Sequence, residues 1–416
     1  MSNNGSSIGT LSISVQTMSS INPISNAKVS IFRSDKSVVM TGLNTDSSGQ
    51  TTVVELGTPP FEYSQVPDGG KPYSEYTVRV EAPGFESVNV DGVQVLPDTL
   101  ALQRVRMRQL LPDTSIGPTT IDIEQHTLWG VFPPKIPEDE VKPLPESNGY
   151  VVLSQPVIPE FIVVHLGRPT DTSAQNVWVP FKDYVKNVAS CEIFPTWPKE
   201  TIKANVLAIL SFVLNRVYTE WYRGKGYGFT ITNSTAYDQA FSYGRNYFDD
   251  ISVVVDDIFT SYITRPGIRQ PLFTQFCDGV RTKCPNAMEQ WGSKDLGDQG
   301  LDALSILRTY YGSTIYLAQA EKVQGVPMSF PGEVLQIGST GNSVRTIQEQ
   351  LNSISNHYPL IPKQRVDGVY GPQTAEAVRI YQQTFNLPVT GSVDFGTWYA
   401  ISNTYVGVNR FSETVL

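Results

Sequence analysis

Glu192 is the residue whose type and surroundings most clearly favour acid–base chemistry. It interrupts the run YVKNVASCEIFPTWPKETIKANVLAIL, residues 184–210, which otherwise suits a core. Ile193, Phe194 and Trp197 follow it, and apolar surroundings disfavour the charged form of a carboxyl group. A carboxyl group still protonated near neutral pH can protonate a leaving group. We therefore predict that Glu192 is a general acid, and the alternative is a surface residue or a cap of the following helix.

The segments on either side of Glu192 should form a buried scaffold. Thr196-Trp197-Pro198, with Glu200 two places on, predicts a helix start, and IKANVLAILSFVLNRVYTEWY (202–222) is apolar on nearly all sides. Upstream, EFIVVHLG (160–167) predicts a buried strand. It contains His165, which we interpret as a hydrogen-bonded core residue rather than a ligand. These patterns predict an α+β central domain over residues 151–331.

Length and charge exclude some classes of protein. The chain has 416 residues, which suggests two to four domains, each able to bury its own core. It has 40 acidic and 31 basic residues and a formal charge of −9, which argues against a protein that follows the phosphates of a nucleic acid. We expect no nucleic-acid partner.

The N-terminal sequence MSNNGSSIGTLSISVQT has neither a basic region nor an apolar core, so we expect no Sec signal peptide. The most apolar helical run, Ile202 to Tyr218, is interrupted by four polar or charged residues. These are Lys203, Asn205, Asn215 and Arg216. We therefore expect no transmembrane segment.

Residues 1–110 alternate in the manner of short strands, as in LSISVQT, AKVSIFRS and QTTVVEL, and turn residues close each run. The pattern predicts an antiparallel all-β sandwich. The order NAKVSIF, TDSSGQTTV, YTVRVEAPGFESVNVDGVQV resembles the carboxypeptidase-regulatory-like (prealbumin-like) sandwich. We expect a structural or interaction domain.

Residues 111–150 are rich in proline and carry the acidic cluster Glu138-Asp139-Glu140, so we predict an extended, semi-rigid linker that packs poorly and is open to proteases. The stretch IDIEQHTLWGVFPPKIPEDE (121–140) is nevertheless too apolar for a free tether. We expect some of it to lie on a neighbouring domain.

Residues 332–416 combine helical spacing with glycine-rich turns. Val344, Ile347 and Leu351 share one helix face, and Ala375, Val378 and Tyr381 share another. The segments Gly338 to Gln348, DGVYGPQT (367–374) and Tyr381-Gln382 through Leu387-Pro388 to Gly391 resemble the three-helix peptidoglycan-binding domain. The glycines should serve turns of positive φ. The resemblance implies a peptidoglycan ligand. It assigns to the peptidoglycan-binding module the residues Asp367, Gly368, Tyr370 and Gly371.

DYVKNVASCEIFPTWPKETIKANVLAILSFVLNRV (183–217) resembles the signature of the SpoIID/LytB family of sporulation and cell-wall proteins. The matching residues are Tyr184, Val185, Val188, Glu192, Trp197, Glu200, Lys203 and Ala204, with Asn205 in place of the family's glutamine. YDQAFSYG (237–244) resembles a second segment of that family. The resemblance implies that Glu192 is the catalytic acid. It suggests as substrate-binding residues Lys203, Asp238, Gln239 and Tyr243.

The order of sandwich, SpoIID-like domain and wall-binding module resembles the clostridial spore-cortex-lytic enzymes of the SleC type. That resemblance implies a zymogen stored in the coat and cortex region of the spore, without export by Sec, and acting on cortex peptidoglycan. It also implies activation by a subtilisin-like protease of the Csp type. We predict a cut between about Glu138 and Gln155, within ESNGYVVLSQ (146–155).

The number of catalytic carboxylates distinguishes hydrolysis from transglycosylation. Ordinary glycosidases use two carboxylates. A lytic transglycosylase needs one, because the muramic acid 6-hydroxyl attacks the anomeric carbon of its own sugar. A second acid for a hydrolase would have to come from elsewhere in the fold, and the candidates are Asp238, Asp249, Asp250, Asp256 and Asp257. We predict a transglycosylase, with a non-enzymatic amidase activator of the LytB type and a phage-type endolysin as alternatives.

Three cysteines, Cys191, Cys277 and Cys284, are too few for a disulfide framework. Some SpoIID relatives hold zinc through cysteines in the region of Cys277 and Cys284. Two thiols without a nearby histidine do not complete a tetrahedral zinc site. We expect buried thiols or a chance pair of cysteines, and no cofactor.

Overall fold

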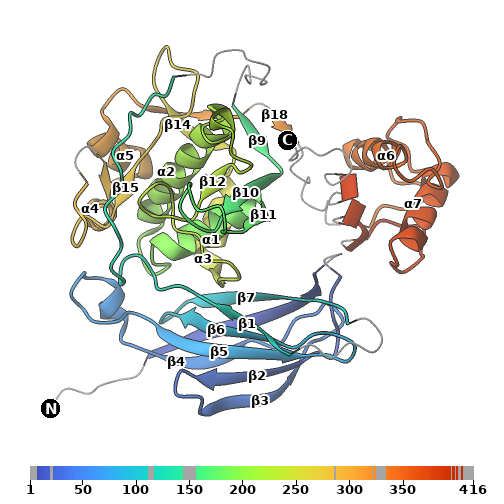
Figure 1. Cartoon of the computed structure of the whole chain (residues 1–416), viewed down its shortest axis with the longest axis horizontal. Helices are drawn as coiled ribbons and strands as arrows, with labels where there is room; N and C mark the ends of the chain where they lie inside the picture. Colours follow the sequence, from blue (N-terminus) through green and yellow to red (C-terminus); the bar gives the residue numbers. More distant parts are fainter. Residues whose placement is uncertain are drawn as a thin grey trace. The chain divides into compact units, whose positions relative to one another are not determined.

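The computed structural model describes residues 7–18, 22–110, 117–143, 156–284, 287–320, 322–324, 334–394, 396–398, 400–401 and 404–405. These residues form two compact units, one of residues 1–15 and 24–324 and the other of residues 16–23 and 325–416 (Figure 1). The first unit contains Glu192 and the second contains the module with helical spacing.

Two β-sheets form the N-terminal part of the first unit, as the alternation predicts. One sheet has the order β3-β2-β5-β6-β8 and the other β13-β7-β1-β4. Figure 1 labels strands β1 to β7 of these sheets. Leu11, Ile13 and Val15 alternate inward along β1 and are fully buried. The strands are β1 Ser7–Thr17, β2 Lys28–Arg33, β3 Val38–Asn44, β4 Val54–Thr58, β5 Ser74–Glu81, β6 Val88–Val95, β7 Leu100–Met107 and β8 Thr119–Asp122, with the 3-10 helix η1 at Phe61–Ser64.

Both sheets are completed from outside the first 110 residues. Strand β8, in the linker, pairs parallel with β6, and β13 (Tyr247–Phe248), in the central region, pairs antiparallel with β7. Asn246, just before β13, accepts a hydrogen bond from Gln94 N at 3.0 Å and donates one to Gln94 O at 2.8 Å. The sheets, the linker and the central region are therefore hydrogen-bonded together within one unit.

Helix α2 (Lys199–Tyr218) is the scaffold of the central region and is buried on almost every face, as its apolar sequence predicts. Pro198 is its N-cap, next to the predicted start. It contacts the other helices of this region, α1 Phe181–Glu192, α3 Asp249–Ile258, α4 Gln290–Asp298 and α5 Ala303–Tyr311. The short strands around it are β9 Val157–Pro159, β10 Phe161–His165, β11 Asn176–Pro180, β12 Ile231–Thr232, β14 Ser261–Thr264, β15 Phe276–Cys277, β16 Met288–Glu289, β17 Tyr316–Gln319 and β18 Lys322–Gln324, with the 3-10 helix η2 at Arg223–Lys225.

His165 is a core residue, as the sequence predicts. It ends the buried strand β10, its Nδ1 lies 2.8 Å from Asn176 Oδ1, and its Nε2 lies 3.1 Å from Arg168 O. Its ring stacks on Phe229 at 4.4 Å between centroids. Both ring nitrogens thus lie within hydrogen-bonding distance of oxygen atoms inside the protein.

The linker packs far more closely than its proline content predicts. Residues 119–122 form β8, and the segment from Glu124 to Lys142 contacts the central region. His126, Leu128 and Lys142 are buried. The linker packs through hydrogen bonds and ion pairs to the core. Its local sequence propensities do not reveal these contacts. The prediction that this segment packs poorly is therefore wrong for its described part.

The second unit contains helices α6 (Asn342–Ile354) and α7 (Pro372–Thr384) around a core with Trp398 at its centre. Val344, Ile347 and Leu351 are fully buried in it, as their spacing predicts. Gly368 adopts a φ of 73°. Gly371 does not follow the prediction, because its φ is −92° and it serves as the N-cap of α7.

Gly244 of the central region lies against strand β8 of the linker, so a substitution there tests whether this packing stabilises the first unit. Gly244 has a φ of 76°, and a Cβ there would lie 2.7 Å from Ile121 Cγ2, whereas at Gly267, with a φ of 80°, a Cβ would meet nothing within 4 Å. Both Gly→Ala changes strain the backbone, but only Gly244→Ala pushes on a stiff β-branched side chain. We expect Gly244→Ala to lower the free energy of unfolding by roughly 1–3 kcal/mol more than Gly267→Ala, measured by denaturant titration. Equal losses would contradict this packing.

Candidate functional site

Glu192 is the last residue of helix α1 and is only 3% exposed. It does not cap the next helix, because Pro198 is the N-cap of α2. The alternative of a surface or capping residue is therefore wrong. The following residues, Ile193, Phe194 and Trp197, are buried, as the sequence predicts.

The carboxylate itself lies among polar groups. Ala240 N donates to Oε1 at 3.0 Å, and Oε2 lies 2.9 Å from the Thr127 hydroxyl and 3.2 Å from Gln290 Nε2. Thr127 comes from the linker, Ala240 from the loop after β12, and Gln290 from the first turn of α4. The apolar setting predicted from the sequence therefore describes the residues that follow Glu192, whereas the carboxylate is held by hydrogen-bond donors.

A cavity of about 40 Å³ lies beside Glu192. Its core side consists of Glu192, Thr235, Phe276, Cys277, Asp278, Thr282 and Gln290. Its other side is the linker, through Thr127, Gly130, Phe132, Pro133 and Lys135. A guest the size of benzene needs roughly 150 Å³, so the cavity admits a few water molecules but no sugar ring. The linker thus forms one wall of this small space next to Glu192.

The linker is anchored on both sides of Thr127. Thr127 N donates to Cys191 O at 3.0 Å, and the neighbouring His126 is completely buried. Leu128 N donates to His126 Nδ1 at 3.2 Å, so the ring's Nε2 carries the proton that reaches Ile193 O at 3.2 Å. Further along, Lys135 Nζ donates to Asp238 O at 2.6 Å.

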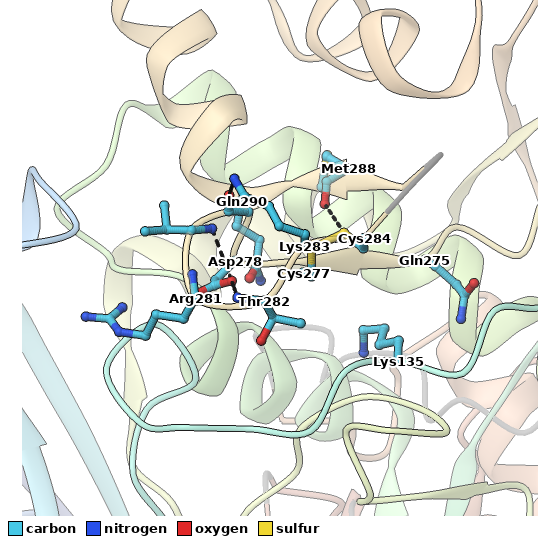
Figure 2. The surroundings of a disulfide bond; sticks show 12 residues. Lys135, Gln275, Cys277, Asp278, Arg281, Thr282, Lys283, Cys284, Met288 and Gln290 are labelled. Atoms are coloured by element: carbon cyan, nitrogen blue, oxygen red, sulfur yellow. Dashed lines mark hydrogen bonds between the residues drawn. A yellow bond between two sulfur atoms is a disulfide. The ribbon is translucent and has the colours of Figure 1, made fainter.

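Cys277 and Cys284 form a disulfide, which closes a loop at the edge of the cavity (Figure 2). The prediction of buried thiols is wrong for this pair, because spacing alone does not show that their Cα atoms approach to 6.0 Å. Arg281 from this loop donates to Leu128 O at 2.7 Å and to Pro67 O at 3.2 Å. The loop therefore touches both the linker and the segment between η1 and β5 in the N-terminal part. Cys191 is a free, buried cysteine, and burial raises the pKa of its thiol to about 11.

The residues that the SpoIID/LytB resemblance suggests for substrate binding lie in different settings. Asp238 is fully buried and accepts hydrogen bonds from Arg216, Tyr222 and Thr232. Gln239 is also buried and accepts a hydrogen bond from the Tyr184 hydroxyl at 3.1 Å. The next residue along, Ala240, is the one that contacts Glu192. Tyr243 is 45% exposed, and Lys203 is half-buried on α2.

The structure also locates the candidates for a second carboxylate. Asp249, Asp250, Asp256 and Asp257 belong to α3 and are exposed. Asp278, which the sequence analysis missed, lines the cavity. Its oxygens accept hydrogen bonds from Thr282 N at 2.6 Å and Arg281 N at 2.9 Å. These bonds stabilise the disulfide-closed turn.

The module residues of the second unit stabilise a turn. Asp367 Oδ1 accepts from Val369 N at 2.9 Å and from Gln348 Nε2 at 3.1 Å. Gln348 Oε1 accepts from Gly368 N at 2.8 Å, and the buried Tyr370 donates to Gly391 O at 3.0 Å. Gln348, which is buried on α6, is the centre of this turn and was not singled out from the sequence beyond ending a motif.

Within the residues that the structure describes, three or more His, Cys, Asp or Glu side chains nowhere gather in a way that could hold a metal ion. Likewise, none of the described helices is long and apolar enough to cross a membrane.

The second unit matches a known class of domain. Residues 340–401 fit the family described as "Putative peptidoglycan binding domain". The chain thus carries a peptidoglycan-binding domain in its C-terminal part, and peptidoglycan is the partner that this domain indicates.

Among solved structures, the crystal structure of the SleB N-terminal domain is 32% identical to this chain, with a TM-score of 0.16. The match covers 18% of this chain and 97% of that chain. The similarity therefore extends over nearly the whole length of that domain but over only a small part of this chain. No curated protein matches the chain significantly.

Two further structures are much more distant. The minor pilin GBS52 of Streptococcus agalactiae is 10% identical, with a TM-score of 0.19, over 27% of this chain and 49% of that chain. Catechol 1,2-dioxygenase from Acinetobacter sp. ADP1 is 13% identical, with a TM-score of 0.19, over 29% of this chain and 60% of that chain. This chain spans less than two thirds of either protein, and at these scores neither indicates a function.

His126 should make the closed site sensitive to acid. Burial, assisted by the nearby Arg245 cation, lowers the pKa of His126 well below 6.5. The folded protein keeps the ring neutral, while the unfolded chain takes up a proton below about pH 6.5, so unfolding binds protons and stability falls as the pH drops.

We therefore expect wild-type stability to fall below pH 6.5 by up to about 1.4 kcal/mol per pH unit more than that of His126→Gln. The amide of glutamine can replace both ring contacts but does not titrate in this range. Denaturant titrations of the two proteins between pH 5 and 7.5 measure the difference. Parallel pH profiles would show that His126 does not control the acid response.

Proposed function

We propose that this protein is the zymogen of a spore-cortex peptidoglycan-degrading enzyme, a lytic transglycosylase in which Glu192 is the catalytic acid. The proposal is supported by the C-terminal peptidoglycan-binding domain and by the similarity to a SleB domain. The observation that carries it is the position of Glu192, a buried carboxylate beside a small cavity of which the linker forms one wall. We further propose a SpoIID-like central domain, a three-helix binding module and a location in the coat and cortex region of the spore.

The reaction would need one carboxyl group in two states. Protonated Glu192 gives its proton to the glycosidic oxygen while the bond from that oxygen to the anomeric carbon of muramic acid breaks. The carboxylate then accepts the proton of the muramic acid 6-hydroxyl, whose oxygen bonds to the same carbon. The products are a 1,6-anhydro end and a free hydroxyl group on the leaving sugar. No water is consumed.

Ala240 N and Gln290 Nε2 would hold the carboxylate in place through this cycle, because both belong to the core. Asp238 stabilises the loop that contains Ala240, because it lies two residues before Ala240 and accepts a hydrogen bond from Arg216 Nε at 2.8 Å. We accordingly propose that Asp238 and Gln239 orient the site. Tyr243 and Lys203 remain proposed as outer substrate contacts.

Asp278 is the candidate for the second carboxylate that a hydrolase would need. It lines the cavity, but backbone N–H groups of its own turn occupy its oxygens at 2.6 and 2.9 Å. A general base would need a lone pair directed at water. These contacts favour a structural role for Asp278, and hence the transglycosylase.

We propose that the linker keeps the stored enzyme inactive, and its contacts around Glu192 support this. Thr127 contacts the Glu192 carboxylate, and residues 130–135 occupy the space where a sugar would have to bind. The proposed cut within residues 146–155 lies outside the described residues. Glu138 and Lys142, at the start of the wider cleavage window, are held by the core, so that part is a poor protease site.

The chemical role of Glu192 can be tested with an isosteric change. Glu192→Gln keeps the size of the side chain but cannot donate the proton, so we expect glycan release by the activated protein to fall at least about 100-fold. The exposed Glu62→Gln serves as the control and should release glycan at the wild-type rate. Mass spectrometry of muropeptides from decoated spores provides the measurement, with anhydro-muramic products expected.

Other product patterns would change the assignment. Reducing ends in place of anhydro ends would indicate a hydrolase. Wild-type activity without glycan cleavage, seen only as stimulation of an added amidase, would indicate a LytB-type activator. Full activity of Glu192→Gln would make Glu192 a structural residue.

A further inference from the structure

Residues 135–142 of the linker lie on the first unit like a bound extended peptide. Glu138, Glu140 and Lys142 are partly or fully buried, whereas Asp139 and Val141 between them are exposed. This alternation is that of an extended chain with one face on a surface. The residues beneath it, which we call the groove, are Gln270 and Gln275 in the loop after β14 and Arg216 near the C-terminal end of α2.

Two glutamine side chains of the groove bind backbone groups of the segment, which are the same for any sequence. Gln275 Nε2 donates to Ile136 O at 2.8 Å, and Gln275 Oε1 accepts from Glu138 N at 3.2 Å. Gln270 makes the same pair of bonds to the N–H and C=O groups of Lys142, at 3.0 and 2.9 Å. Side-chain amides placed in this way can hold any extended amide chain.

The groove also has a carboxylate site. Arg216, whose side chain is fully buried, donates from Nη2 to Glu138 Oε1 at 2.7 Å and from Nη1 to Oε2 at 3.0 Å. Burial alone would raise the pKa of Glu138, but the hydrogen bonds from Arg216 and Lys142 hold it below the usual value. Such a bidentate contact is among the strongest that proteins make with carboxylates.

Removal of the linker would leave this site incomplete. Arg216 would keep Asp238 as a partner but would lose both Glu138 contacts. Nη1 of this buried guanidinium group would lose its Glu138 acceptor, which is costly, whereas Nη2 would keep Tyr237 O at 3.1 Å. The groove without its linker is therefore expected to favour another ligand that brings a carboxylate.

The groove begins at the Glu192 cavity. Lys135 lines that cavity, and Gln275 directly precedes Phe276 and Cys277, which line it from the other side. Figure 2 shows Gln275 and Lys135 on the same side of the disulfide loop. A ligand in the groove would thus lead directly to the carboxyl group of Glu192.

We infer that this groove binds the stem peptide of peptidoglycan through its amide groups and the free carboxylate of its glutamate, and that residues 135–142 occupy the groove in the intact chain in place of that peptide. The inference rests on the proposed function, because the stem peptide is attached to the muramic acid whose anomeric carbon would react. Gln275 and Gln270 would hold its amide groups and Arg216 its carboxylate. Glu138 stands in for that carboxylate here.

The inference can be tested by hydrogen–deuterium exchange on the full chain after it has been cut within residues 146–155, with both pieces retained. Three probes are compared: a disaccharide with its tetrapeptide stem, the same compound with the glutamate carboxylate amidated, and the disaccharide alone. We expect the first to displace the linker and to raise amide exchange over residues 135–142. The amidated probe should need a roughly tenfold higher concentration, and the bare disaccharide should have no effect.

Two neighbouring linker variants provide the matched control. Glu138→Gln weakens the occupant and should improve binding of the tetrapeptide probe roughly tenfold, whereas Asp139→Asn, on the exposed face, should leave it unchanged. Equal effects of the two variants, an effect of the bare disaccharide equal to that of the tetrapeptide probe, or no displacement by any probe would overturn the inference.

This measurement involves no glycan cleavage, so its outcome is separate from that of the proposed enzyme. Displacement by the tetrapeptide probe together with a failed muropeptide assay would refute the enzyme but keep the groove. Glycan cleavage with no response to the stem peptide would refute the groove alone.

Discussion

A buried carboxylate must accept hydrogen bonds, and Glu192 accepts some of its hydrogen bonds from residues outside the central region. Ala240 and Gln290 belong to the core, whereas Thr127 belongs to the linker. The contacts that stabilise the intact chain are therefore the same contacts that hold the linker against the cavity. His126 is buried beside Phe194, and Arg281 reaches Leu128, so the linker is held on both sides of Thr127.

A second buried network joins the linker to the same loop of the core. Arg216 lies between Asp238 of the core and Glu138 of the linker, at 2.8 and 2.7 Å. The desolvation of these charges is offset only while all partners are present. Removal of the linker would thus affect Glu192 twice, by the loss of the Thr127 contact and by a change in the charges around the Asp238 segment. We regard this coupling as the physical basis of the proposed zymogen.

Periodicity predicts the scaffold of this site well and the linker's contacts poorly. The buried helix α2, the strand ending at His165 and the burial of Glu192 follow from patterns within about twenty residues. The apolar part of the linker was expected to lie on a neighbouring domain. The polar contacts, such as Glu138 with Arg216 or Arg281 with Leu128, join residues 78 and 153 positions apart. Local sequence carries no signal of that kind, and the Cys277–Cys284 disulfide was missed for a similar reason, since it depends on the path of the loop between the two cysteines.

In the proposed zymogen, the linker keeps Glu192 inaccessible until the chain is cut. This can be tested by the rate of cortex lysis by the intact chain and by the chain cut within residues 146–155 with a subtilisin-like protease, measured on decoated spores at equal protein concentration. We expect the intact chain to be nearly inactive and the cut chain to lyse cortex, with Glu192→Gln inactive in both forms. An intact chain that lyses cortex as fast as the cut chain would contradict it.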